Sequence, residues 1–229
     1  MQIKTKDEIK KLIKSSQLAD RCYRYICSVI KPGMTEKKVA KLMNDFMLKN
    51  GAEALSFETI VGSGPNSSKI HSTPSNRVIK YGDVVQLDFG CIVDGYCSDC
   101  SRVLFMGEVK PEYRKIYNIV YEAQITGIKN FKVGMKASQV DALSRDIIKR
   151  KGYNFNHAVG HAVGTVVHED PVVSPKTTKD IIKNNMCITI EPGIYIDKKF
   201  GIRIEDTCIV KDGKLIPLNH TTKRIKVIN

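Results

Sequence analysis

The sequence contains no tryptophan, no long apolar run and no low-complexity segment. No stretch comes near the roughly 20 consecutive apolar residues that a helix needs to cross a bilayer. The first sixteen residues are rich in lysine and lack the apolar centre of a signal peptide. These absences argue against a membrane-spanning or exported protein, and they predict a cytoplasmic one.

Cysteine is present, but not in a pattern typical of a disulfide framework. Seven cysteines at irregular spacing, without an export signal, predict free thiols in a reducing compartment. Cys97 and Cys100 form a CxxC pair, a spacing found in zinc and redox sites. However, this segment reads as a strand, where residues three apart point to opposite faces. We therefore do not expect the two thiols to bind one ion.

Acidic residues are outnumbered by basic ones. The chain has 37 Lys and Arg against 24 Asp and Glu, which gives a net charge of +13. Nucleic-acid binding is one interpretation of such a charge. The basic residues are spread over the whole length and mixed with acids, so we interpret them as a solvated surface.

Hydrophobic periodicity predicts one α/β domain over residues 1–229, with helices covering one face of a mostly antiparallel sheet. The predicted helices are 6–29, 35–50, 111–130 and 136–151. The predicted strands are 57–61, 84–93, 96–105, 187–191, 194–196 and 202–210. Residues 63–76 are rich in turn-forming residues and predict a loop.

Asp94-Gly95 separates two β-rich runs and predicts a hairpin with a two-residue type I′ turn. The register set by this turn makes Asp88 and Asp99 diagonal neighbours on one face, about 7–8 Å apart or less. Two buried carboxylates at this distance need a positive charge, because unpaired they would be costly. The alternatives are a pair of surface aspartates or a pair neutralised by Arg102.

Three of the five histidines, His157, His161 and His168, fall within twelve residues. Neutral imidazole is a common ligand for Zn, Mn, Fe and Co. Any one of them could instead be a hydrogen-bonded core residue or a helix cap. The clustering of three makes a functional site the better interpretation.

Two glutamates interrupt apolar runs. Glu191 follows Ile-Thr-Ile, and in the second run alternation puts Arg203 and Glu205 on the face opposite their apolar neighbours. A glutamate there is either bound to a metal or paired with Arg203. With the two aspartates and a histidine, the acids form an oxygen-rich set that suits two Mn²⁺, Co²⁺, Fe²⁺ or Zn²⁺ ions better than a structural zinc.

The same residues lie in motifs that resemble the pita-bread metallopeptidases, and within them the catalytic domain of Xaa-Pro dipeptidases and aminopeptidases. The resemblance covers the chain from about Lys6 to Ile228. The motifs, in order, are Phe57–Ser67, His71, Leu87–Gly90, Asp94–Asp99, Ser101-Arg102, Gly160-His161, His168-Glu169, Ile190–Gly193 and Arg203–Asp206. The resemblance implies a pseudo-symmetric fold with a curved sheet.

The resemblance also implies a role for each site residue. Asp88 would bind one metal, Asp99 and Glu205 would bridge two metals, and His161 and Glu191 would bind the other. The remaining active-site positions would be His71, His157, His168 and Arg203. Two divalent ions, Mn²⁺ before Co²⁺, Fe²⁺ or Zn²⁺, would activate water against the first peptide bond. Glu191 would carry the proton, His168 would stabilise the oxyanion and His71 would contact the scissile amide.

We therefore expect an aminopeptidase for peptides with a free N-terminus, most of all Xaa-Pro peptides, as a monomer or homodimer. Two departures from the Xaa-Pro pattern stand out. The chain begins where the extra N-terminal domain of those enzymes would end, and Ala162 replaces a usual glycine. The alternatives are a methionine aminopeptidase, whose basic surface would suit work near ribosomal RNA, a non-catalytic pita-bread binding module, and a nucleic-acid binder.

Overall fold

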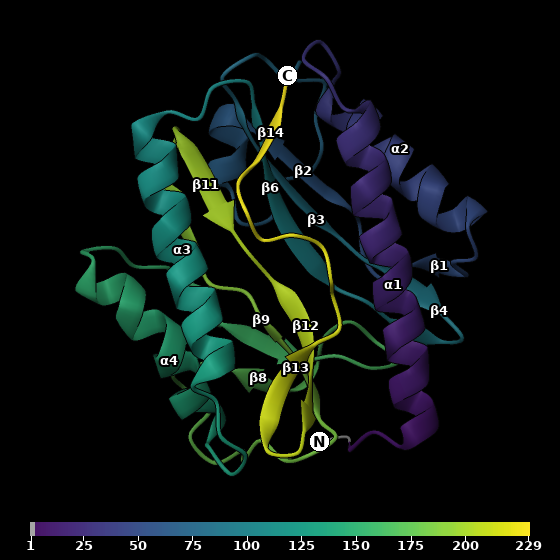
Figure 1. Cartoon of the computed structure of the whole chain (residues 1–229), viewed down its shortest axis with the longest axis vertical. Coiled ribbons are helices and arrows are strands. Elements are labelled where there is room, and N and C mark those ends of the chain that lie inside the picture. Colours follow the sequence, from purple (N-terminus) through teal and green to yellow (C-terminus); the bar gives the residue numbers. More distant parts are fainter. Residues whose placement is uncertain (1–2) are drawn as a thin grey trace.

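The computed structural model describes residues 3–229, and its elements form two similar runs. In each run two helices precede a set of short strands (Figure 1). The first run contains α1 (Lys6–Val29), α2 (Glu36–Lys49), β1 (Ala54–Leu55), β2 (Ile60–Ser63), the 3₁₀ helix η1 (Gly64–Ser68), β3 (Val84–Phe89), β4 (Cys91–Val93), β5 (Tyr96–Cys97) and β6 (Cys100–Met106).

The second run repeats this plan. It contains α3 (Pro111–Lys129), α4 (Ala137–Arg150), β7 (Gly160–Ala162), β8 (Glu169–Val173), β9 (Cys187–Ile190), β10 (Gly193–Ile196), β11 (Phe200–Arg203), β12 (Asp206–Lys211) and β13 (Lys214–Pro217). The last strand, β14 (Lys226–Ile228), returns to the first half and pairs with β6. The two halves therefore repeat one order of elements, as the predicted pseudo-symmetry requires.

The two main sheets are almost entirely antiparallel. Their strand orders are β14-β6-β3-β2 and β13-β12-β9-β7-β8, and only the β14–β6 pair is parallel. Helices α1 and α2 lie on one side of the molecule and α3 and α4 on the other, with the strands between them (Figure 1). The predicted α/β fold with mostly antiparallel strand pairing is thus confirmed. Strands β1, β7, β8, β13 and β14 were not predicted.

Local sequence explains where the first helices begin and end. Thr5 and Glu8 form a capping box at the start of α1, and the Thr35 side chain accepts a hydrogen bond from the backbone of α2. Such caps satisfy backbone N–H groups that have no partner within the helix. The chain turns after α1 through Gly33, whose φ of 93° is readily adopted only by glycine.

The first hairpin has the predicted register. Val93 pairs with Tyr96 and Asp88 pairs with Ser101, and both Asp94 and Gly95 have positive φ, as a type I′ turn requires. The hairpin is interrupted between β3 and β4 on one side and between β5 and β6 on the other. Asp99 lies in the gap between β5 and β6, and Asp88 lies near the end of β3.

The second hairpin follows the same plan and corrects one prediction. Residues 202–210 are not one strand, because the chain leaves β11 after Arg203 and enters β12 only at Asp206. The break between them contains Glu205, and Glu191 lies at the matching break after β9. The strand predicted at residues 57–61 is also shifted along the chain, because β2 runs from Ile60 to Ser63.

Each half has its own apolar core. The first packs α1 and α2 against β2, β3 and β6, and includes Cys100. The second packs α3 and α4 against the strands of the second half, and it also includes Val84 of β3 with Val103 and Phe105 of β6. Cys97 lies in a third cluster with Leu12 and Val163, so the CxxC thiols face different cores, and all seven cysteines are free.

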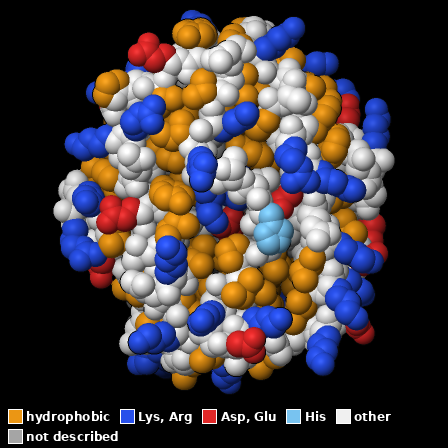
Figure 2. Space-filling view, viewed as in Figure 1, with side chains coloured by type: hydrophobic (Ala, Val, Ile, Leu, Met, Phe, Trp, Pro, Cys, Tyr) orange, Lys and Arg blue, Asp and Glu red, His pale blue; other side chains and the backbone are white. Residues whose placement is uncertain are grey.

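Figure 2 shows how the basic side chains are distributed on one face of the molecule. Lys and Arg side chains are scattered over the face in Figure 2 and do not form a single stripe. Within residues 3–229, none of the helices combines the length and the apolar character needed to cross a membrane.

The core of the first half should be sensitive to loss of volume. Leu87 is fully buried in β3, so Leu87→Ala should lower the free energy of unfolding by about 2–5 kcal/mol. Val78 is 45% exposed, and Val78→Ala should change it by less than about 0.5 kcal/mol. Urea unfolding of both variants measures the difference; equal effects would contradict the assignment of Leu87 to the core.

Candidate metal centre

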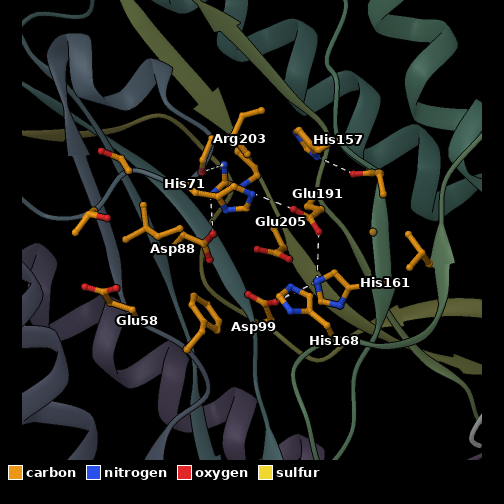
Figure 3. A pocket seen from close by; sticks show the side chains of 18 of the residues that line it. Glu58, His71, Asp88, Asp99, His157, His161, His168, Glu191, Arg203 and Glu205 are labelled. Atoms are coloured by element: carbon orange, nitrogen blue, oxygen red, sulfur yellow. Dashed lines mark hydrogen bonds and ion pairs between the residues drawn. The ribbon is translucent and has the colours of Figure 1, made fainter.

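The five predicted ligand residues converge on one place between the two halves. Asp88 lies in β3, Asp99 just before β6, and His161 in β7, while Glu191 follows β9 and Glu205 precedes β12. All five line the same cavity. In Figure 3 their side chains point towards one another.

The ring of His161 is oriented as a ligand. Its Nδ1 lies 3.1 Å from the carbonyl oxygen of Ala162. If Nδ1 carries the proton and donates it there, Nε2 has a free lone pair. That Nε2 lies 3.4 Å from Asp99 Oδ2 and 3.5 Å from Glu191 Oε1. A lone pair facing two carboxylates is unfavourable unless a cation lies between them.

Thr189 holds both ligands of this pair. Its hydroxyl oxygen accepts a hydrogen bond from the backbone N–H of His161 at 3.1 Å, and the hydroxyl donates to Glu191 Oε1 at 3.3 Å. This role of Thr189 was not predicted from the sequence. The only signal was a threonine in the middle of an apolar strand.

Glu205 and Asp99 are the most deeply buried acids of the cluster, at 1% and 4% exposure. Neither carboxylate oxygen of Glu205 has a hydrogen-bond partner among the described residues. Burial, followed by the charge of Asp99, raises the pKa of Glu205 well above its usual value, and burial with Asp88 does the same for Asp99. A cation between the two carboxylates would offset both causes.

The donor set therefore fits divalent cations. One ligand atom each from Asp99, His161 and Glu205 lies within 4.8 Å of the others. Asp88 adds an Oδ1 that has no hydrogen-bond partner within residues 3–229. Four carboxylates and one imidazole are hard and borderline donors, which suit Mn²⁺, Fe²⁺, Co²⁺ or Zn²⁺.

Arg203 is the cation that meets Asp88. Its Nη2 lies 2.6 Å from Asp88 Oδ2, whereas its Nε is 4.0 Å from Glu191. The alternative in which Arg102 neutralises the two aspartates is wrong, because Arg102 points away from this cluster to Asp206.

A hydrogen-bonded chain links Arg203 to His157. Arg203 Nη1 donates to the Tyr195 hydroxyl at 2.8 Å, which lies 3.1 Å from His157 Nε2. Burial and the charge of Arg203 lower the pKa of His157 to about 3, so its ring is neutral near pH 7. Gln86 accepts from the backbone N–H of Arg203 at 2.7 Å. Tyr195 and Gln86 were missed, although a glutamine in the apolar strand β3 was a signal.

The other two histidines lie at the exposed side of the cluster. His168 packs its ring edge-on against His161, with 4.4 Å between ring centroids. His71 lies in the loop that follows η1 and lines the cavity. All the predicted site residues therefore reach the same cavity.

The loop that bears His71 is tied down by one buried acid. Glu36 is fully buried, and its carboxylate accepts hydrogen bonds from Ser63, Asn66 and Ser75. These bonds lower the pKa of Glu36 although burial raises it. Both ends of the segment from Ser63 to Ser75 are thus fixed to the start of α2.

Behind the cluster lies a buried ion network centred on Asp206. Asp206 accepts from Arg102 Nη2 at 2.6 Å, from Gln124 Nε2 at 2.8 Å and from Lys223. Arg102 also donates to the backbone carbonyl of Glu205. The network therefore holds the backbone on which Glu205 projects.

Comparisons with known proteins agree with this geometry. Residues 10–212 match the model of metallopeptidase family M24. The chain belongs to this family. It is 39% identical to the Xaa-Pro dipeptidase of Pyrococcus furiosus over 225 residues. This alignment covers 97% of the chain and 64% of that relative.

Solved structures show that the M24 chain has the predicted pita-bread fold. A Xaa-Pro dipeptidase from Bacillus anthracis matches with a TM-score of 0.96 and 40% identity, over 98% of this chain and 64% of the other. An X-Pro aminopeptidase from Thermotoga maritima matches with a TM-score of 0.95 and 37% identity, over 99% and 64%. The M24 chain thus spans 64% of the length of each of these three relatives.

The Asp206 network should be important for stability. Arg102 is 1% exposed, and Arg102→Met leaves buried polar groups without a partner, so it should lower the free energy of unfolding by about 3–5 kcal/mol. Arg150→Met, at an exposed position in the last turn of α4, is the matched control and should have little effect. Urea unfolding compares them, and similar midpoints would contradict the role of the network.

Divalent ions should stabilise this M24 chain by relieving repulsion among the acids. Mn²⁺ at about 100 times its Kd should add about 2.7 kcal/mol and raise the Tm by about 5–10 °C. Glu205→Gln should lose most of this increase, whereas Asp197→Asn, on an exposed turn, should keep it. Thermal scans with and without Mn²⁺ test this; an equal shift in both variants would place the ion elsewhere.

Proposed function

We propose that the chain is a two-metal aminopeptidase that removes the first residue from peptides and prefers an Xaa-Pro bond. The observation that carries this proposal is the convergence of four acids, three of them buried, and one oriented imidazole at an open cavity. Neither carboxylate oxygen of Glu205 has a hydrogen-bond partner within residues 3–229. The printed names of the relatives, Xaa-Pro dipeptidase and X-Pro aminopeptidase, support the bond preference.

The ligands divide between two ions. Asp88 and its unpartnered Oδ1 would hold one ion, and His161 with Glu191 would hold the other. Asp99 and Glu205, the most buried acids, would contact both. Two such ions, when bound, polarise a peptide carbonyl and lower the pKa of water towards neutrality. Mn²⁺ is our first candidate, with Co²⁺, Fe²⁺ and Zn²⁺ as the other ions that the donor set accepts.

The side chains around the ions supply the remaining chemistry. The Glu191 carboxylate accepts a proton from the attacking water and passes it to the leaving nitrogen. His168, on the open side of His161, donates to the oxyanion of the tetrahedral intermediate, a contribution of about 2.7–4 kcal/mol in other oxyanion sites. His71 contacts the scissile amide or the leaving residue.

Arg203 and His157 have supporting roles. Arg203 fixes Asp88 through its 2.6 Å ion pair and thereby sets the direction of the remaining carboxylate oxygen. His157, held by Tyr195 and by the carbonyl oxygen of Ala158, keeps a neutral ring beside the cavity. A non-catalytic pita-bread binding module would lack some of the metal ligands. All five ligand positions are filled in this chain, which favours an enzyme.

The test is a comparison of two peptide classes with the metal-loaded protein. We expect release of alanine from Ala-Pro-Ala-Ala, slower release of methionine from Met-Ala-Ser, and no hydrolysis after the metal is removed. Asp99→Ala should abolish activity and lower the bound metal, measured by elemental analysis, while Asp197→Ala keeps both. Activity that persists without metal would reject the proposal, and a preference for Met-Ala-Ser would favour a methionine aminopeptidase.

A further inference from the structure

The connection between β7 and β8 ends at His168, which lies beside the metal centre. Strand β7 ends at Ala162 and β8 begins at Glu169, and these two residues pair with each other. The ring of His168 packs edge-on against His161 (Figure 3), but it takes part in no hydrogen bond within residues 3–229. Apart from that ring contact, the place of His168 therefore depends on how the backbone of the connection is held.

Glu169, the residue after His168, joins the connection to the segment that precedes α1. Its Oε1 accepts a hydrogen bond from the backbone N–H of Thr165 at 3.0 Å, so the carboxylate closes the connection on itself. Its Oε2 accepts a hydrogen bond from Lys4 Nζ at 2.6 Å. The side chain of Lys4 is fully buried, and that of Glu169 is 12% exposed. Lysine is almost never fully buried unless it is paired, so this ion pair is a specific feature of the fold.

The backbone around Lys4 is anchored to both halves of the molecule. Its N–H donates to the carbonyl oxygen of Asn185 at 2.8 Å, in the turn before β9. Thr5, the next residue, caps α1. Glu8, in the first turn of α1, accepts a hydrogen bond from the Tyr96 hydroxyl at 2.7 Å. The ammonium group of Lys4 is thus carried on a backbone that is fixed on both sides of it.

The connection also leaves space for the ion pair. A Cβ atom at Gly164 would lie 1.9 Å from Glu169 Oε1 and 2.3 Å from Lys4 Nζ. Any larger residue at this position would therefore displace the pair. The carbonyl oxygen of Gly164 accepts a hydrogen bond from the backbone N–H of Cys97 at 2.8 Å, which holds the glycine itself in place. The ion pair and the backbone of the connection consequently fit against each other.

We propose that Lys4 and Glu169 are positioning residues, whose ion pair holds the connection so that His168 faces the substrate carbonyl at the metal centre. This proposal rests on the proposed function, in which His168 donates to the oxyanion. Neither Lys4 nor Glu169 lines the cavity, so both act through the connection. The oxyanion forms only during the chemical step, and a displaced His168 should therefore lower kcat and leave KM almost unchanged.

Lys4→Met tests the ion pair, because methionine keeps much of the apolar stem and removes the charge. With the Mn²⁺-loaded protein and Ala-Pro-Ala-Ala, we expect kcat to fall about tenfold or more, since loss of a whole oxyanion donor costs about 10²–10³ in kcat. Lys6→Met removes the same charge at an exposed position at the start of α1, and it should change neither kcat nor KM. An unchanged kcat in Lys4→Met, or an effect on KM alone, would overturn the proposal.

Glu169→Gln breaks the same pair from the other side, and it carries the test if Lys4→Met does not fold. The amide keeps an oxygen for the backbone N–H of Thr165 but presents N–H donors to the ammonium group of Lys4. We expect kcat to fall about tenfold or more again. The double variant should lose no more than about threefold beyond the worse single variant, because the two residues act as one pair. Losses that multiply would overturn the ion pair as their cause.

The metal-induced rise in Tm separates positioning from loss of the metal centre. Neither Lys4 nor Glu169 is a candidate metal ligand, so the rise produced by Mn²⁺ should persist in both single variants. Rates are compared at a temperature at which thermal scans show all variants to be folded. Loss of the Mn²⁺-induced rise would mean that the metal centre itself had changed, and it would overturn a role limited to His168.

The place of the His168 ring is measured independently of turnover by nuclear magnetic resonance. In protein with isotope-labelled histidine and diamagnetic Zn²⁺, His168→Gln and His71→Gln identify the two ring signals. Lys4→Met should shift or broaden the His168 signal and leave the His71 signal unchanged, and an unchanged His168 signal would overturn the inference. If the wild-type protein hydrolyses no peptide, the proposed function fails, and the ring signals still decide whether the ion pair places His168.

Discussion

Repulsion among buried carboxylates is the constraint on which the rest of this structure depends. Four acids and one imidazole meet between the two halves, where burial already disfavours charge. The surrounding protein holds these groups in place from behind. Arg203 fixes Asp88, Thr189 fixes His161 and Glu191, and the Asp206 network fixes the backbone of Glu205. The acids therefore cannot turn away from one another, and the repulsion is relieved either by protonation, which the raised pKa values of Asp99 and Glu205 favour, or by a bound cation.

The parts of the fold that the sequence predicted are those set by local rules. Periodicity and capping located the four long helices, and the Asp94-Gly95 turn determined the register that brings Asp88 and Asp99 together. The failures involve long-range pairing. The strands β7, β8, β13 and β14 are short, and they pair with segments that local pattern cannot identify. The break at Glu205 was not predicted, because the apolar residues before it and those from Cys208 to Val210 were taken as parts of one strand.

In the site, too, features set by local sequence were predicted and contacts between distant residues were not. The ligand candidates were recognisable because polar residues interrupt apolar runs and because their order resembles a known family. The partners of those ligands were not recognisable. Arg102 could be matched to the aspartates by proximity in sequence, but its partner is Asp206, more than one hundred residues away. Gln86 and Tyr195 support Arg203 in the same way, through contacts between separate strands.

Because the same hairpin plan occurs in both halves, the candidate ligands are synthesised in two separate groups. Each half contributes two of the four acids, at the break in its own hairpin, and the histidine belongs to the second half. A nascent chain that ends after α4 contains Asp88 and Asp99 but lacks the opposing ligands. The set of five candidate ligands is therefore complete only when the chain has been synthesised as far as Glu205 and the second hairpin has packed against the first half.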